Sequence, residues 1–131
     1  MSVNNECLLS LERLFYDKIY FERKGFKNDE ELEIDIKVGL GKYNDDLDVV
    51  SLIAEGEKLN EYSIYVQVSG FFKVEENSSI NKEDLLQINA VAILMPYLRR
   101  QISLLTTQPE VDSVMLPLYN INGLVKEMRK K

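Results

Sequence analysis

The sequence contains no histidine, and this absence narrows the chemistry open to the protein. Histidine is the side chain best suited to proton transfer near neutral pH, and it is the commonest ligand of transition metals. Without an imidazole partner, the single cysteine, Cys7, lacks the neighbouring base that activates a thiol for nucleophilic catalysis. We therefore expect a protein that is not an enzyme, with no catalytic residues, no metal ligands and no cofactor.

Cysteines and long apolar runs are equally scarce. One cysteine cannot form an intrachain disulfide, which fits a reducing compartment. The longest apolar run, Ala90 to Pro96, is far shorter than the roughly 20 residues of a membrane-spanning helix. The N-terminal residues lack the basic and apolar regions of a signal peptide. These features predict a cytoplasmic protein that does not insert into a membrane.

Two short motifs superficially resemble ligand-binding loops. Asp45, Asp46 and Asp48 lack the glycine at the sixth position and the closing glutamate of a calcium loop. Gly39 and Gly41 are only two of the glycines that a dinucleotide-binding loop needs, and no helical pattern follows them. We interpret the first motif as a solvated turn and the second as a strand that ends in a bend.

The charge balance argues against nucleic-acid binding. The net charge is −6, from 22 acidic and 16 basic residues, and this excess of negative charge repels a phosphate backbone. The only basic cluster comprises Lys126, Arg129, Lys130 and Lys131. We expect these residues to complement the C-terminal end of a helix.

With 131 residues, of which 45% are hydrophobic, the chain has the size and composition of one globular domain spanning 1–131. Four segments alternate apolar and polar residues or are apolar throughout, as β-strands do. In the first segment the odd positions are mostly apolar. No helical pattern separates the segments, so we predict an antiparallel sheet. The predicted strands are Leu9–Phe21, Leu32–Leu40, Leu47–Glu55 and Tyr62–Val74, with a turn at Asn44-Asp45-Asp46.

The period then changes to that of a helix. Asn81 is a suitable N-cap for a long apolar helix from Lys82 to about Thr106. Pro96 lies inside this helix and cannot donate a hydrogen bond to the carbonyl group of Ala92. We therefore predict a kink near Ala92 to Pro96.

An irregular connection from Gln108 to Pro117 should follow the long helix. Asn120 can then cap a short C-terminal helix whose apolar residues recur with helical spacing. These residues are Ile121, Leu124, Val125 and Met128. The predicted fold class is thus α+β: a four-stranded antiparallel sheet followed by a long kinked helix and a short C-terminal helix.

The strands carry more apolar side chains than one covered face of a sheet requires. Tyr16, Tyr20, Tyr65 and Phe71 are expected on the faces opposite the main apolar sets. A surplus of this kind on a small domain indicates burial against another subunit or an open groove. Self-association is the preferred explanation for the sheet residues, and both explanations remain open for the C-terminal connection and helix.

Four segments resemble the SecB family of export chaperones. The run Asn89–Arg99, an apolar helix that meets Pro-Tyr and then Arg, is similar to the first-helix motif of that family. Leu116–Leu124 resembles the stretch in which the crossover loop of the family enters its second helix. Arg13–Glu22 resembles the first strand, and the alternation from Leu32 to Ile36 resembles the second. The specific part of the resemblance runs from Ile88 to Leu124.

The resemblance implies a four-stranded sheet with two helices, assembled as a dimer of dimers and hence a homotetramer. It implies that unfolded polypeptides are held in apolar grooves and passed to SecA without ATP or metal. Carried over by position, the polypeptide-binding residues are Leu32, Ile34, Ile36, Val114, Leu116, Leu124, Val125 and Met128. Glu22 corresponds to one of the acidic positions that contact SecA in the family, whereas Lys18 and Tyr65 stand at two others.

Several functional hypotheses follow from the sequence. The first is an ATP-independent chaperone, or holdase, for unfolded or precursor polypeptides in protein export. The second is a dedicated chaperone of one client, such as an antitoxin. The third is a self-assembling interaction protein on the same fold. An enzyme that uses paired carboxylates is the least favoured hypothesis, because histidine is missing.

Overall fold

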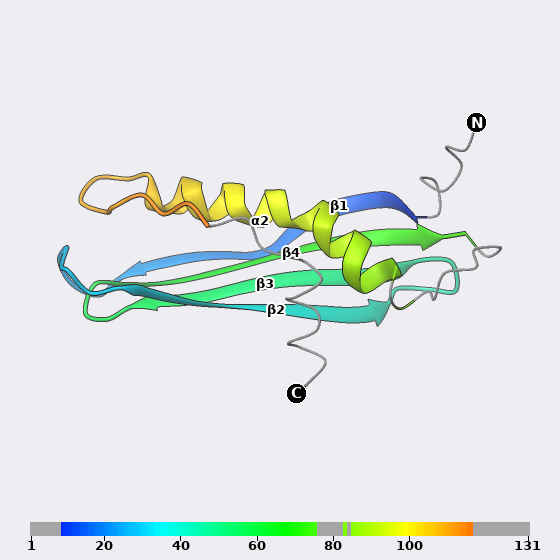
Figure 1. The fold of residues 1–131 in the computed structure, drawn as a ribbon, viewed down its shortest axis with the longest axis horizontal. Coiled ribbons are helices and arrows are strands. Elements are labelled where there is room, and N and C mark those ends of the chain that lie inside the picture. The colour runs from blue at the N-terminus through cyan, green and yellow to red at the C-terminus, as the bar shows by residue number, and fades with distance from the viewer. Residues whose placement is uncertain (1–8, 76–82, 84, 117–131) are drawn as a thin grey trace.

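The computed structural model describes residues 9–75, 83 and 85–116 (Figure 1). Four strands are followed by a π-helical segment, η2, and a helix, α2. Their bounds are β1 Leu9–Arg23, β2 Leu32–Lys42, β3 Asp48–Lys58, β4 Tyr62–Val74, η2 Leu85–Ala90 and α2 Val91–Thr106. The strands form one antiparallel sheet in the order β1-β4-β3-β2. The predicted sheet followed by a long helix is confirmed, while the predicted cap at Asn81 and the C-terminal helix lie outside the described residues.

The structure has two layers. Helix α2 lies along one face of the sheet, over β4 and β3 (Figure 1). We call this the inner face and the opposite one the outer face. Alternate residues of β3 and β4 point inward and are almost fully buried, because side chains of a strand alternate between its two faces. The inner row includes Val50, Leu52, Ile64, Val66, Val68 and Phe72. Both described helical elements lie on the inner face, so no described helix covers the outer one.

Strand β1 departs from the alternation that the sequence predicts. Its pairing with β4 shifts between Leu11 and Arg13 and again between Tyr16 and Lys18. Each shift adds one residue to β1 and reverses which side chains face inward. Tyr16 therefore points inward, opposite Val68, whereas Phe15 points outward.

The prediction that the odd residues of the first strand share one face is therefore wrong, as is the prediction that Tyr16 lies opposite the main apolar set. The physical reason is that β1 is apolar at both parities, and periodicity alone does not reveal a bulge. Tyr20, Tyr65 and Phe71 do lie on the outer face.

The inward turn of Tyr16 creates a contact between sheet and helix. Its hydroxyl group donates a hydrogen bond of 3.0 Å to the carbonyl oxygen of Tyr97 in α2. Partial burial is the main reason why the pKa of Tyr16 is raised.

We expect Tyr16→Phe to lower the free energy of unfolding by about 0.5–1.5 kcal/mol, the usual net value of such a bond. Urea denaturation measures this change. Tyr20→Phe is the matched control, because the Tyr20 hydroxyl donates only to Glu22 on the same strand. Its expected effect is within about 0.5 kcal/mol. Equal losses in the two variants would contradict the assignment.

The long helix packs through one stripe of buried residues. Val91, Leu94, Met95, Leu98 and Ile102 recur at the spacing of an amphipathic helix and face the sheet. Pro96 is exposed within α2, and α2 is preceded directly by the π-helical turns of η2. Figure 1 shows the helical axis changing direction near the junction of η2 and α2, close to the predicted kink.

Candidate polypeptide-binding site

Strand β2 forms one edge of the sheet and carries all three of the predicted polypeptide-binding residues that lie in strands, Leu32, Ile34 and Ile36. It pairs with β3 over eleven consecutive residues without a bulge, and with no other described strand. Its other edge therefore presents backbone N–H and C=O groups that a further strand can pair with. The inner row of β2 is Leu32, Ile34, Ile36, Val38 and Leu40. An apolar row beside a free backbone edge is suited to extended peptides.

The predicted site residues differ in how much surface they offer. Ile36 and Leu116 are buried members of one hydrophobic cluster, and Leu32, Ile34 and Val114 pack against it as half-buried residues. The half-buried residues are thus the ones with apolar surface available to a ligand.

Of the other site residues, Leu124, Val125 and Met128 lie outside the described residues. Leu40 is missing from the set of binding residues that the resemblance to the SecB family implies. It continues the inner row of β2 and is 40% exposed. Its place in the alternation was the signal that could have identified it.

The segment that follows α2 is irregular, as predicted from Gln108, as far as Leu116, where the description ends. The backbone N–H of Val114 donates a 2.8 Å hydrogen bond to Oγ1 of Thr106. Nε of Arg99 donates to the carbonyl oxygen of Leu116 at 3.1 Å. These bonds hold the segment against the helix, and they leave Met115 77% exposed between two anchored neighbours.

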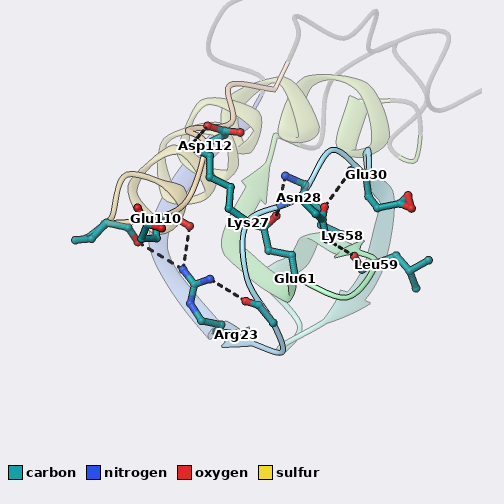
Figure 2. A network of polar contacts seen from close by, with 11 residues as sticks. Arg23, Lys27, Asn28, Glu30, Lys58, Leu59, Glu61, Glu110 and Asp112 are labelled. Atoms are coloured by element: carbon teal, nitrogen blue, oxygen red, sulfur yellow. Dashed lines mark hydrogen bonds and ion pairs between the residues drawn. The ribbon is translucent and has the colours of Figure 1, made fainter.

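The segment that follows α2 also makes polar contacts with the end of β1 and with the β1–β2 loop (Figure 2). Nη2 of Arg23 donates to the carbonyl oxygen of Glu110 at 3.1 Å. Lys27 forms an ion pair of 2.9 Å with Asp112. The hydrogen-bonded Lys27 ammonium lowers the pKa of Asp112, and the Asp112 carboxylate raises the pKa of Lys27. Because both groups are exposed, this pair positions the segment more than it stabilises the fold.

A buried ion pair closes the turn between β3 and β4 (Figure 2). Nζ of Lys58 lies 2.9 Å from Oε1 of Glu61, and the Glu61 side chain is 0% exposed. The backbone N–H of Asn28 donates to the same oxygen at 3.0 Å. Burial acts to raise the pKa of Glu61, but the bonds from Lys58 and Asn28 outweigh it, so the pKa lies below its ordinary value.

Glu61 and Asp112, whose pKa values are lowered, each pair with a lysine rather than with a second acid. Among the described residues, no group of three or more His, Cys, Asp or Glu side chains is placed to hold a metal ion. Across the same part of the chain, no helix is both long and apolar enough to cross a membrane.

The three positions expected to correspond to the SecA contacts lie together on the outer face. Glu22 is opposite Ser63, two residue pairs beyond the Tyr20–Tyr65 pair and on the same face. The Lys18 ammonium group sits 4.9 Å from the centre of the Tyr65 ring, a cation–π contact. The neighbouring outer positions of β2 and β3 are acidic: Glu33, Asp35, Glu55 and Glu57. This end of the outer face is therefore predominantly negative.

An open antiparallel sheet, one long helix on its inner face and an anchored irregular segment beyond the helix together define a SecB-like chaperone fold. The family model of the preprotein translocase subunit SecB matches residues 8–131. The chain belongs to the SecB family, and the resemblance seen in the sequence is confirmed.

Two relatives illustrate the range of this similarity. An uncharacterized protein of Methanocaldococcus jannaschii is 30% identical over 103 residues, which cover 76% of this chain and 66% of that protein. This chain thus spans just under two thirds of the length of that relative. The SecB-like chaperone of Mycobacterium tuberculosis, solved in complex with a ChAD peptide from the HigA1 antitoxin, superposes with a TM-score of 0.71. The match covers 89% of this chain and 91% of that one at 9% identity, so it shows the shared fold.

Proposed function

We propose that this protein is an ATP-independent holdase for unfolded or precursor polypeptides. The observation that carries the proposal is edge strand β2, which combines an unbroken backbone edge with an apolar inner row. An extended client can pair with the edge and bury alternate side chains against the row. Backbone pairing is largely independent of sequence, so such a site accepts many clients.

The proposed binding residues extend from β2 into the segment after α2. Leu32 and Ile34 contribute half-buried aliphatic surface, and Val114 contributes more from the anchored segment. Ile36 and Leu116 support these residues from the core. Leu124, Val125 and Met128 complete the proposed set. Each 100 Å² of apolar surface that a client buries here is worth about 2.5 kcal/mol before ordering costs.

The proposal includes a cytoplasmic homotetramer, a dimer of dimers, that works without metal or nucleotide. It also includes SecA as a partner that contacts Glu22. The acidic character of the surrounding outer face supports a basic partner there. Lys18, at a position that is acidic in the family, weakens the attraction.

A second candidate function is that of a dedicated chaperone of one client. It is favoured by the structural relative from Mycobacterium tuberculosis, which was solved with a peptide from an antitoxin. On the same fold, such a protein would use the same β2 edge but recognise one client sequence. A holdase protects unrelated denatured proteins, whereas a dedicated chaperone protects only its partner.

Light scattering of a denatured, slowly folding protein diluted into buffer without nucleotide tests the holdase proposal. We expect stoichiometric amounts of this protein to suppress aggregation. The double variant Leu32→Thr, Ile34→Thr should need a several-fold higher concentration, because it removes apolar surface while placing β-branched threonines, which favour a strand, at both positions. Ile53→Thr on the outer face is the matched control and should act like the wild type. A folded protein with no effect at several-fold excess would overturn the general holdase function.

A further inference from the structure

Arg23, the last residue of β1, bonds to two segments that lie far apart in the sequence (Figure 2). Its Nη1 donates a hydrogen bond of 2.9 Å to the carbonyl oxygen of Gly25. Its Nη2 donates to the carbonyl oxygen of Glu110 at 3.1 Å and to that of Pro109 at 3.5 Å. The planar fork of a guanidinium group can hold several carbonyl groups in one fixed geometry. The side chain therefore fixes the turn after α2 against the end of the sheet.

The turn that Arg23 holds has a backbone conformation that is unfavourable for its residue. Glu110 has a φ of 63°, as does Asn60, but asparagine is a residue type enriched in this region and glutamate is not. Pro109 followed by a positive φ matches a type II turn, whose third position normally holds glycine. Such a conformation persists only where neighbouring contacts hold it. Here the bonds from Arg23 lie on one side of Glu110, and the buried side chain of Val111 lies on the other.

This turn leads into the apolar part of the segment that follows α2. Val114, four residues after Glu110, packs against the hydrophobic cluster as a half-buried residue. Met115, which is 77% exposed, adds adaptable apolar surface beside it. The Lys27–Asp112 ion pair between the turn and Val114 is exposed and contributes little by itself. The course of the backbone at Glu110 thus decides where these apolar side chains are presented.

We propose that Arg23 is a positioning residue of the client site, which orders the segment that follows α2 before a client binds. The inference rests on the proposed holdase function, because Val114 belongs to the proposed binding set. A segment that already has its bound conformation loses less conformational entropy on binding. If only a fraction of the molecules has the ordered segment, the apparent affinity falls by that fraction. Arg23 acts through the backbone of Pro109 and Glu110.

Hydrogen–deuterium exchange of the free protein, read by mass spectrometry, tests the ordering directly. Arg23→Met removes the three hydrogen bonds but keeps an aliphatic chain. We expect the amide hydrogens of residues 107–116 to exchange about three- to tenfold faster, with α2 unchanged. Arg13→Met is the matched control, because Arg13 is an exposed arginine toward the other end of β1. Equal exchange in Arg23→Met and the wild type would overturn the inference.

Client affinity is measured with fluorescently labelled, reduced and carboxymethylated lactalbumin, which stays unfolded and soluble. Titration by anisotropy without nucleotide should show about three- to tenfold weaker binding for Arg23→Met. Arg13→Met should bind like the wild type. Arg23→Lys keeps a positive charge near the buried Glu61, so its urea midpoint should match that of the wild type. It should still bind more weakly than the wild type, because an ammonium group lacks the planar fork.

A rescue experiment separates ordering from a general structural loss. Glu110→Gly added to Arg23→Met should restore slow exchange and most of the affinity, because glycine adopts a positive φ without strain. Glu110→Gln removes the same charge but keeps the strain, so it should restore neither. Failure of the glycine rescue, or faster exchange with unchanged affinity, would contradict the positioning role. A wild type that does not bind lactalbumin would contradict the holdase proposal and the client role of Arg23, while the exchange data would still decide the ordering.

Discussion

Replacing Lys58 with methionine is expected to lower the free energy of unfolding by about 3–5 kcal/mol. The ammonium group of Lys58 is the cationic partner of the Glu61 carboxylate, which is fully buried in the turn between β3 and β4. Methionine has a similar length but no charge. The Glu61 carboxylate would then keep its hydrogen bond from Asn28 and the weaker attraction of Arg23, but it would lose the cation bonded to it. A buried charge without a partner is among the most destabilising single changes in a protein.

Denaturant unfolding at neutral pH measures this effect, and Lys37→Met is the matched control. Lys37 pairs with Glu55 at 3.7 Å, but both side chains are more than half exposed, so its loss should cost less than about 1 kcal/mol. The double variant Lys58→Met, Glu61→Gln should recover part of the loss, because no charge remains buried. Similar effects of Lys58→Met and Lys37→Met would contradict the role given to the buried pair.

The pH dependence provides a second readout of the same pair. The pKa of Glu61 is lowered in the folded protein, so its contribution to stability is present above the unfolded carboxyl pKa of about 4.3. This contribution is lost as the pH falls through the lower folded value. In Lys58→Met, protonation instead removes an unpaired buried charge. The difference between wild type and variant should therefore shrink in acid.

Leu98→Ala is expected to destabilise the protein by about 2–5 kcal/mol. Leu98 is 0% exposed and belongs to the buried stripe through which α2 packs on the sheet. Truncation leaves a cavity between two layers that are both regular secondary structure, and such layers relax only in part. This loss would remove a large fraction of the free energy of unfolding of a small domain.

Leu104→Ala separates this packing effect from a general effect on the helix. Leu104 lies on the same helix but is 56% exposed, so its truncation should change stability by no more than about 0.5 kcal/mol. Thermal or denaturant unfolding of both variants measures the contrast. Comparable losses would mean that α2 buries a different face from the one described.

The regular strands could be predicted from the sequence because their signal is local. Strand β4 begins at Tyr62 and ends at Val74, as predicted, and β2 begins at Leu32 as predicted. In both, one face packs in the core and the other does not, which produces a clean alternation. The turn before β3 is equally local, since Oδ1 of Asn44 accepts the backbone N–H groups of Asp46 and Leu47.

The candidate site was predictable only in part. The inner row of β2 follows from its alternation, but the division between buried Ile36 and half-buried Ile34 does not, because both occupy equivalent positions of the pattern. The position of Gly39 and Gly41 within β2 could not be inferred either. In the sequence they suggest a strand ending in a bend, whereas the structure places them inside β2 on an open face.

By itself the sequence determined the α+β class, the four strands, the long helix and the family, because periodicity and a helix motif are properties of neighbouring residues. Only the tertiary structure decided which strands pair, where β1 bulges and which charges are buried. The bulges turn Tyr16 toward α2 and Phe15 away from it, and the closing of the β3–β4 turn against the β1–β2 loop buries Glu61. Such outcomes depend on contacts between residues far apart in the chain, and no local pattern encodes them.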